Sequence, residues 1–110
     1  MSKNERWNSS GSIQVFDAQP GVLYSLEAAA HLTGVSRRSI LIYCKSGLVR
    51  PILEEEYGAM SFNEDAIYAI RKIEYLRSSF GVNLSGIKLI FELTDEVQRL
   101  KEEIRFLRSV

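Results

Sequence analysis

Four cationic side chains lie close together in the middle of the chain. The stretch from 36 to 50 contains no acidic residue, and its cations are Arg37, Arg38, Lys45 and Arg50. Guanidinium and ammonium groups pair with phosphate oxygens, and arginine can also donate two hydrogen bonds to a guanine edge. The stretch therefore predicts a local basic surface suited to nucleic acid, even though Lys plus Arg and Asp plus Glu both total 14.

The residue types that usually carry catalysis or bind metal ions are isolated in this sequence. Cys44 is the single cysteine and His31 the single histidine, so neither an internal disulfide nor a four-ligand zinc site is expected. No nucleophile or orienting acid stands at a useful spacing from His31. The run Glu54, Glu55 and Glu56 has the pattern of a solvated surface. We expect no enzyme activity, no cofactor and no metal.

Two short helices position the basic residues. Ser25 can cap a helix that ends at Gly34, and Ser36 can cap a second helix that ends near Gly47. Val35 follows the glycine and can fill the angle between the helices. Two short helices joined by such a turn predict a helix-turn-helix, with the first two arginines in the opening turn of its second helix.

A small β wing and a third helix are expected next. Leu48, Val49 and Ile52 predict a short edge strand, and the segment 54–62 can turn back on it as a hairpin. Asn63 can then cap a helix closed by Gly81. The apolar residues of this helix repeat at helical spacing, and they are Ala66, Ile70, Ile73, Leu76 and Phe80.

The C-terminal segment carries the most regular apolar spacing in the chain. Asn83 opens it, and apolar residues then alternate by three and four positions, as in a coiled coil. They are Ile90, Leu93, Val97, Leu100, Ile104 and Leu107. The part beyond Glu96 is longer than a small domain can cover, so we expect this helix to pair with a second copy or with a partner.

The chain length of 110 residues fits one globular domain with appendages. We expect a flexible N-terminal arm over 1–21, a helix-turn-helix domain over 22–94 and a dimerisation or partner helix over 95–110. No apolar run reaches the ~20 residues of a membrane span, and the start is polar. We therefore expect no membrane partner and a cytoplasmic location.

Three stretches in this order resemble the MerR family of winged helix-turn-helix regulators. The segments are 24–40, then Tyr43 with 47–51, and 81–88 before the coiled-coil helix. The last segment is most similar to the heat-shock-repressor and chaperone-modulator (CbpM) branches. The resemblance implies an all-α, mainly helical winged helix-turn-helix with a small β wing and a C-terminal coiled-coil helix. It also implies a DNA-binding set, namely Ser36, Arg37, Arg38, Tyr43, Lys45 and Arg50.

Two functions remain open on this resemblance. One is a heat-shock-repressor-like transcriptional regulator that binds DNA as a homodimer without an inducer-binding domain. The other is a chaperone modulator that binds a DnaJ-like co-chaperone through a fold whose DNA-binding face has decayed. Leu41 stands where the family's DNA binders usually place arginine, and the wing segment 59–62 lacks arginine, which favours the second function. Arg37 and Arg38 favour the first, which we prefer.

The charges beside the coiled-coil stripe leave the direction of helix pairing open. With Ile90 at heptad position a, Glu96 and Glu103 fall at g, and Lys101 and Arg108 fall at e. Opposite charges meet in a parallel pair, and like charges meet in an antiparallel pair. The resemblance implies antiparallel pairing, so the charge pattern and the resemblance disagree.

Overall fold

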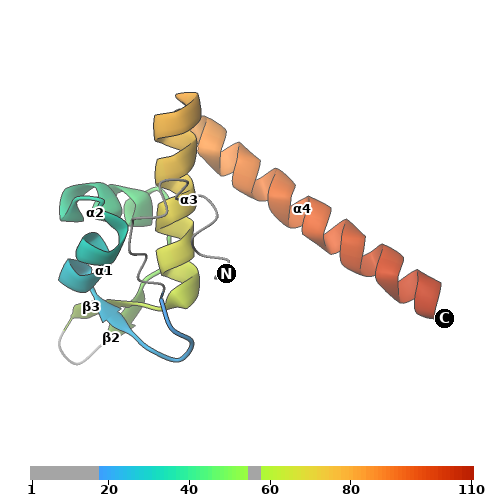
Figure 1. Cartoon of the computed structure of the whole chain (residues 1–110), viewed down its shortest axis with the longest axis horizontal. Helices are drawn as coiled ribbons and strands as arrows, with labels where there is room; N and C mark the ends of the chain where they lie inside the picture. The colour runs from blue at the N-terminus through green and yellow to red at the C-terminus, as the bar shows by residue number, and fades with distance from the viewer. Residues whose placement is uncertain (1–17, 55–57) are drawn as a thin grey trace, which may run out of the picture. The chain divides into compact units, whose positions relative to one another are not determined.

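The computed structural model describes residues 18–54 and 58–110, which form four helices and three short strands (Figure 1). In chain order the elements are β1 (Tyr24–Ser25), α1 (Leu26–Thr33), α2 (Arg37–Lys45), β2 (Ile52–Glu54), β3 (Ala59–Phe62), α3 (Glu64–Phe80) and α4 (Leu84–Ser109). The chain divides into two compact units, one ending at Arg71 and one from Lys72 to Val110. The predicted mainly helical fold with a small β wing is confirmed.

The predicted caps of the helix-turn-helix are present in the first unit. The Ser25 hydroxyl accepts a hydrogen bond from the Ala28 amide at 3.0 Å, and Ser36 accepts one from the Ser39 amide at 3.1 Å. Each hydroxyl satisfies a backbone donor that the first helical turn leaves without a partner. These two serines therefore fix where α1 and α2 begin.

The turn between α1 and α2 depends on a left-handed glycine. Gly34 has φ +73°, and its amide donates to the Ala30 carbonyl at 2.9 Å, which ends α1. The Thr33 hydroxyl donates to the Ala29 carbonyl and accepts from the Val35 amide. Val35 is buried, as expected for a residue that fills the angle between two helices. The turn is thus held by both backbone and side-chain hydrogen bonds.

The wing is a three-stranded antiparallel sheet with the order β1-β3-β2. The hairpin pairs Ile52 with Ser61 and Leu53 with Met60, which confirms the expected return of the chain. β1 adds to the other edge, with Tyr24 opposite Phe62. A two-residue strand is too short to show alternation of apolar and polar residues, so β1 could not be predicted from the sequence.

The edge strand expected from Leu48 begins later than predicted. The Leu48 and Val49 amides both donate to the Tyr43 carbonyl, at 2.9 and 3.3 Å, and are therefore engaged at the end of α2. Their side chains are buried, which accounts for their apolar character without a strand. The first strand of the hairpin starts at Ile52 instead.

The core of the first unit lies between the helix-turn-helix, the sheet and the start of α3. Its fully buried large side chains are Ile40, Val49, Phe62, Ile67 and Ile70. Asn63 caps α3 by accepting from the Ala66 amide at 2.9 Å, as predicted. The Arg71 guanidinium donates to the Leu32 carbonyl at 3.4 Å and so satisfies an acceptor in the last turn of α1.

The end of the expected N-terminal arm belongs to a hydrogen-bonded turn. Ala18 is buried, and the Gln19 amide donates to the Tyr24 hydroxyl at 2.9 Å. The Val22 amide donates to the Gln19 carbonyl and closes the turn. The rest of the arm, with Trp7, lies outside the described residues.

The second unit contains the end of α3 and all of α4. Gly81 has φ +67°, and the Asn83 side chain caps α4 by accepting from the Gly86 amide at 2.8 Å. Ile73 and Ile87 are fully buried. Phe80, the last member of the apolar repeat, is 65% exposed because it ends α3, and its ring packs edge to face with that of Tyr75.

Candidate nucleic-acid interface

The exposed face of α2 gathers the expected basic residues. At 3.6 residues per turn, positions 37, 38, 41, 42 and 45 fall within one side of the helix. All five side chains are exposed, whereas Ile40 and Tyr43 on the other side are buried. The outward residues are Arg37, Arg38, Leu41, Ile42 and Lys45. We call these five residues the α2 face.

Arg37 pairs with an acid that the sequence analysis did not single out. Its Nη1 lies 3.3 Å from Oε2 of Glu27 on α1, and both side chains are more than half exposed. An ion pair this exposed is worth only ~0–1 kcal/mol, so a phosphate can compete for the guanidinium. The two residues are ten positions apart, and only the angle between α1 and α2 brings them together.

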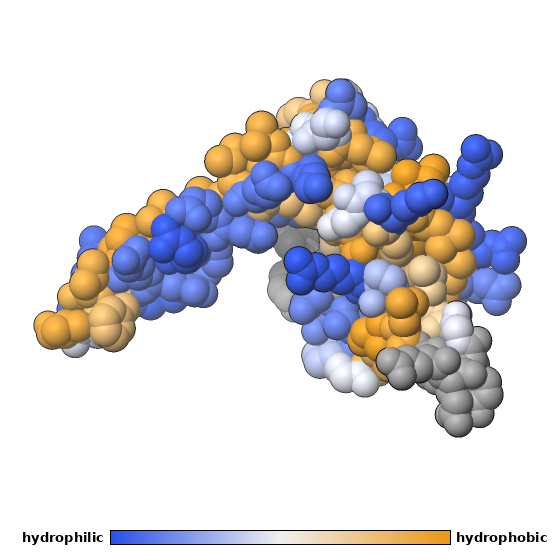
Figure 2. All heavy atoms as spheres, turned by 180° about the vertical axis from the view of Figure 1, so that it is seen from behind, coloured by the Kyte–Doolittle hydropathy of each residue, from blue (hydrophilic) through white to orange (hydrophobic). Residues whose placement is uncertain are grey.

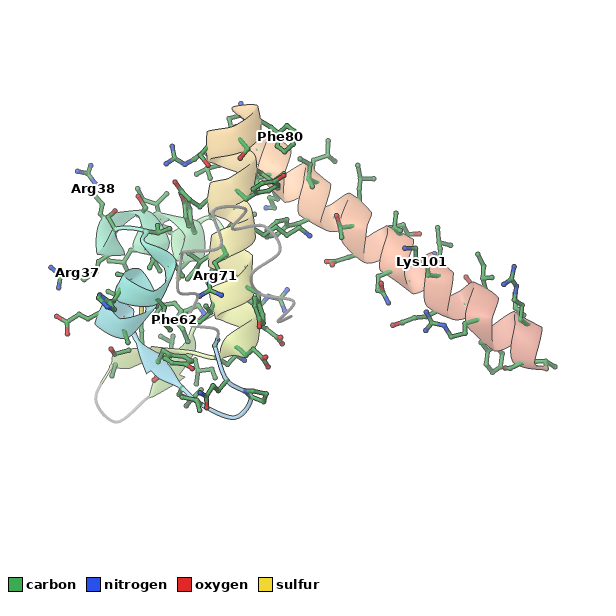
Figure 3. The ribbon with its side chains drawn as sticks, in the orientation of Figure 1. Arg37, Arg38, Phe62, Arg71, Phe80 and Lys101 are labelled. Carbon is green, nitrogen blue, oxygen red and sulfur yellow. The ribbon has the colours of Figure 1, made fainter. Side chains whose placement is uncertain are left out.

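Arg38 makes no ion pair with any residue that the structure describes, and its side chain is exposed. Figure 3 shows Arg37 and Arg38 extending outward from α2 rather than toward the core of the unit. Arg38 is therefore available to an external anion without first giving up a partner.

The charge at the start of α2 is opposite to that of its neighbours. Glu27 lies in the first turn of α1, and Glu64 and Asp65 lie in the first turn of α3, where acids stabilise the positive helix end. α2 has no acid there and begins with Arg37 and Arg38. Cations at this end cost ~0.3–1 kcal/mol each, so stability of the isolated helix does not account for them.

The other predicted contact residues differ in their exposure and in their hydrogen bonds. Lys45 in the last turn of α2 and Arg50 in the following loop are both exposed. Ser36 is engaged as the cap of α2, and its hydroxyl also donates to that of Ser39. Tyr43 is only 3% exposed, so its ring packs in the core, and we leave it out of the interface.

The cysteine and histidine are not arranged for chemistry. Cys44 is half-buried, and burial raises the pKa of its thiol, which disfavours the reactive thiolate. His31 is exposed in the last turn of α1. No cluster of three His, Cys, Asp or Glu side chains suited to a metal ion occurs among residues 18–54 and 58–110.

None of the helices in residues 18–54 and 58–110 has both the length and the apolar character needed to span a membrane.

The apolar stripe of α4 is exposed to solvent. Figure 2 shows hydrophobic residues along one side of this helix and hydrophilic residues beside them. Beyond Ile90 every stripe residue is 42–64% exposed, and these residues are Leu93, Val97, Leu100, Ile104 and Leu107. A row of large apolar side chains with this exposure is typical of a helix that pairs with another helix.

The charges beside the stripe are engaged within α4 itself. Arg99 Nη2 lies 2.6 Å from Glu96 Oε2, and Arg99 Nη1 lies 3.4 Å from Glu103 Oε1. The hydrogen bond and charge of Arg99 lower the pKa of the Glu96 carboxyl below its ordinary value. Both g-position acids thus have a partner on their own helix, which weakens the argument for parallel pairing drawn from their charge.

The capped helix pair, its glycine turn and the β wing define a winged helix-turn-helix protein. Residues 24–109 match the family described as MerR HTH family regulatory protein. The chain is 33% identical over 79 residues to the putative heat shock protein HspR of Streptomyces coelicolor (strain ATCC BAA-471 / A3(2) / M145), covering 72% of this chain and 52% of the relative. The chain belongs to the MerR helix-turn-helix family, and it spans about half the length of this curated relative.

The fold is also similar to a solved structure of the same family. The crystal structure of HiNmlR, a MerR family regulator lacking the sensor domain, bound to promoter DNA, superimposes with a TM-score of 0.59. The match covers 79% of this chain and 76% of that chain at 22% sequence identity. At this identity the similarity supports the fold, which agrees with the strand and helix order described above.

Proposed function

We propose that this protein is a heat-shock-repressor-like transcriptional regulator that binds DNA through the α2 face. The observation that carries the proposal is the pair Arg37 and Arg38 at the start of α2, where the helix dipole disfavours them. In docked helix-turn-helix proteins, this part of the second helix contacts base edges in the major groove. Lys45 and Arg50 add contacts to phosphates, which increase affinity without sequence preference.

The proposed active form is a homodimer joined by the α4 stripe. A dimer sets two recognition helices about one turn of B-DNA apart, ~34 Å, and requires two half-sites related by symmetry. The exposed row from Leu93 to Leu107 supports this pairing. The direction of pairing is left open because Arg99 engages the acids that would have decided it.

The test is a gel shift with genomic fragments over a series of salt concentrations. Wild-type protein should select fragments with two symmetric half-sites, and its affinity should fall steeply with salt because phosphate contacts release counterions. Lys45→Ala should weaken all fragments alike and reduce the salt slope by about one unit. Equal, weak binding to every fragment at ~0.1 M salt would refute the proposal.

The second candidate function is binding of a DnaJ-like co-chaperone, favoured by the exposed aliphatic side chains of Leu41 and Ile42. It predicts that a J-domain protein is captured by both wild type and Arg37→Ala/Arg38→Ala, and that neither binds DNA with sequence preference. A pull-down beside the gel shift separates the two functions.

A further inference from the structure

Two branched aliphatic side chains stand among the cations of the α2 face. Leu41 is 41% exposed and Ile42 is 44% exposed, although each is adjacent to a fully or nearly fully buried residue. Leu41 lies one helical turn after Arg37 and one turn before Lys45, and Ile42 lies one turn after Arg38. The aliphatic pair thus occupies the middle of the surface that the proposed function turns toward DNA.

The core of the unit does not account for this pair. Ile40 and Tyr43 already supply the buried side of α2, and the half-buried Cys44 completes it. More than two fifths of the surface of Leu41 and of Ile42 remains exposed within the described residues. Single exposed leucine or isoleucine side chains are common, but two neighbouring aliphatic side chains surrounded by three cations form a distinct chemical surface.

Only one base offers an apolar group in the major groove. Thymine presents its C5-methyl group there, whereas the other three bases present only hydrogen-bond donors and acceptors at their edges. Arginine and lysine around the aliphatic pair would hold phosphates and guanine edges. A surface with aliphatic groups inside a cationic frame therefore complements thymine methyl groups inside a phosphate frame.

We propose that Leu41 and Ile42 select thymine by packing on its methyl group, which makes them specificity-determining residues of the DNA site. This inference rests on the proposed function. One helical turn advances ~5.4 Å and one base step ~3.4 Å, so the selected thymines lie about one to two base pairs from the bases or phosphates that Arg37 and Arg38 contact.

The experiment removes the methyl groups one at a time. A site is first selected from random duplexes with wild-type protein, and each thymine is then replaced by deoxyuracil, which lacks only the methyl group. Binding should weaken about threefold to fivefold at one or two positions of each half-site, the effect expected for one buried methyl group. At those positions Leu41→Ala or Ile42→Ala should bind thymine and uracil sites equally.

Leu89→Ala is the matched control because Leu89 is an exposed leucine on α4. This variant should keep the wild-type discrimination between thymine and uracil. Circular dichroism should show that all three variants keep their helix content, since each changed side chain is exposed.

The outcomes separate the inference from the function. If wild type binds a selected site specifically but every uracil substitution changes affinity by less than twofold, the inference is wrong and the proposed function stands. If wild type selects no site, both are wrong. Loss of J-domain capture in Leu41→Ala, with no DNA selection by wild type, would instead assign the aliphatic pair to a protein partner.

Discussion

Replacing Leu100 with Asp should convert a dimer into a monomer. Leu100 lies in the middle of the α4 stripe and is 42% exposed. Covering this exposed part on pairing contributes about 1 kcal/mol per protomer, and a carboxylate in the same place adds a desolvation cost of several kcal/mol. The dimer therefore loses more than about 3 kcal/mol, and its dissociation constant rises more than ~100-fold.

Light scattering at tens of micromolar protein measures this change. Wild type should show the mass of a dimer and Leu100→Asp that of a monomer. Gln98→Asp introduces the same side chain on α4 outside the stripe and should remain a dimer. A dimeric Leu100→Asp variant would show that the stripe is not the interface, and a monomeric wild type would refute pairing through α4.

Three further changes test the local chemistry. Gly34→Ala should lower the free energy of unfolding, measured in urea, by about 1 kcal/mol because φ is +73° at this position, and Gly34→Asn should lower it less. Equal stability of the wild type and both variants would contradict the need for a left-handed residue in the turn. The Glu96–Arg99 pair should stabilise α4 fully at pH values above the ordinary Glu pKa of 4.5, and this stabilisation should be lost as the pH falls through the lowered pKa of Glu96. An NMR titration should therefore give Glu96 a pKa below 4.5 in the wild type, and this pKa should return toward 4.5 in Arg99→Ala. Because burial raises the thiol pKa, Cys44 should react with a disulfide reagent more slowly in the folded protein than in urea at the same pH, and equal rates would show that the thiol is not shielded.

The helix boundaries could be predicted because they depend on local chemistry. Ser25, Ser36, Asn63 and Asn83 each cap a helix with their own side chain three residues before the amide that they accept from. Such hydrogen bonds depend on sequence neighbours alone, so residue type and spacing were sufficient.

Features that depend on tertiary contacts could not be predicted. The ion pair of Glu27 with Arg37 requires the angle between α1 and α2, and β1 requires its partner β3. Tyr43 has the sequence context of a contact residue, but the packing of α2 buries its ring. In the candidate interface, the sequence therefore indicated the cations correctly as surface residues but not which neighbours they meet.

In the proposed function, Arg37 and Arg38 on the α2 face bind DNA. The most direct test compares wild type, Arg37→Ala/Arg38→Ala and the control Lys88→Ala/Arg105→Ala on a selected site and on a scrambled duplex. The control removes the same charge from exposed positions of α4 outside the stripe. We expect Arg37→Ala/Arg38→Ala to lose about 2–4 kcal/mol of binding free energy on the selected site and to lose the preference over the scrambled duplex, whereas the control should keep that preference. Equal losses in both double variants, or an unchanged preference in Arg37→Ala/Arg38→Ala, would contradict the proposed function.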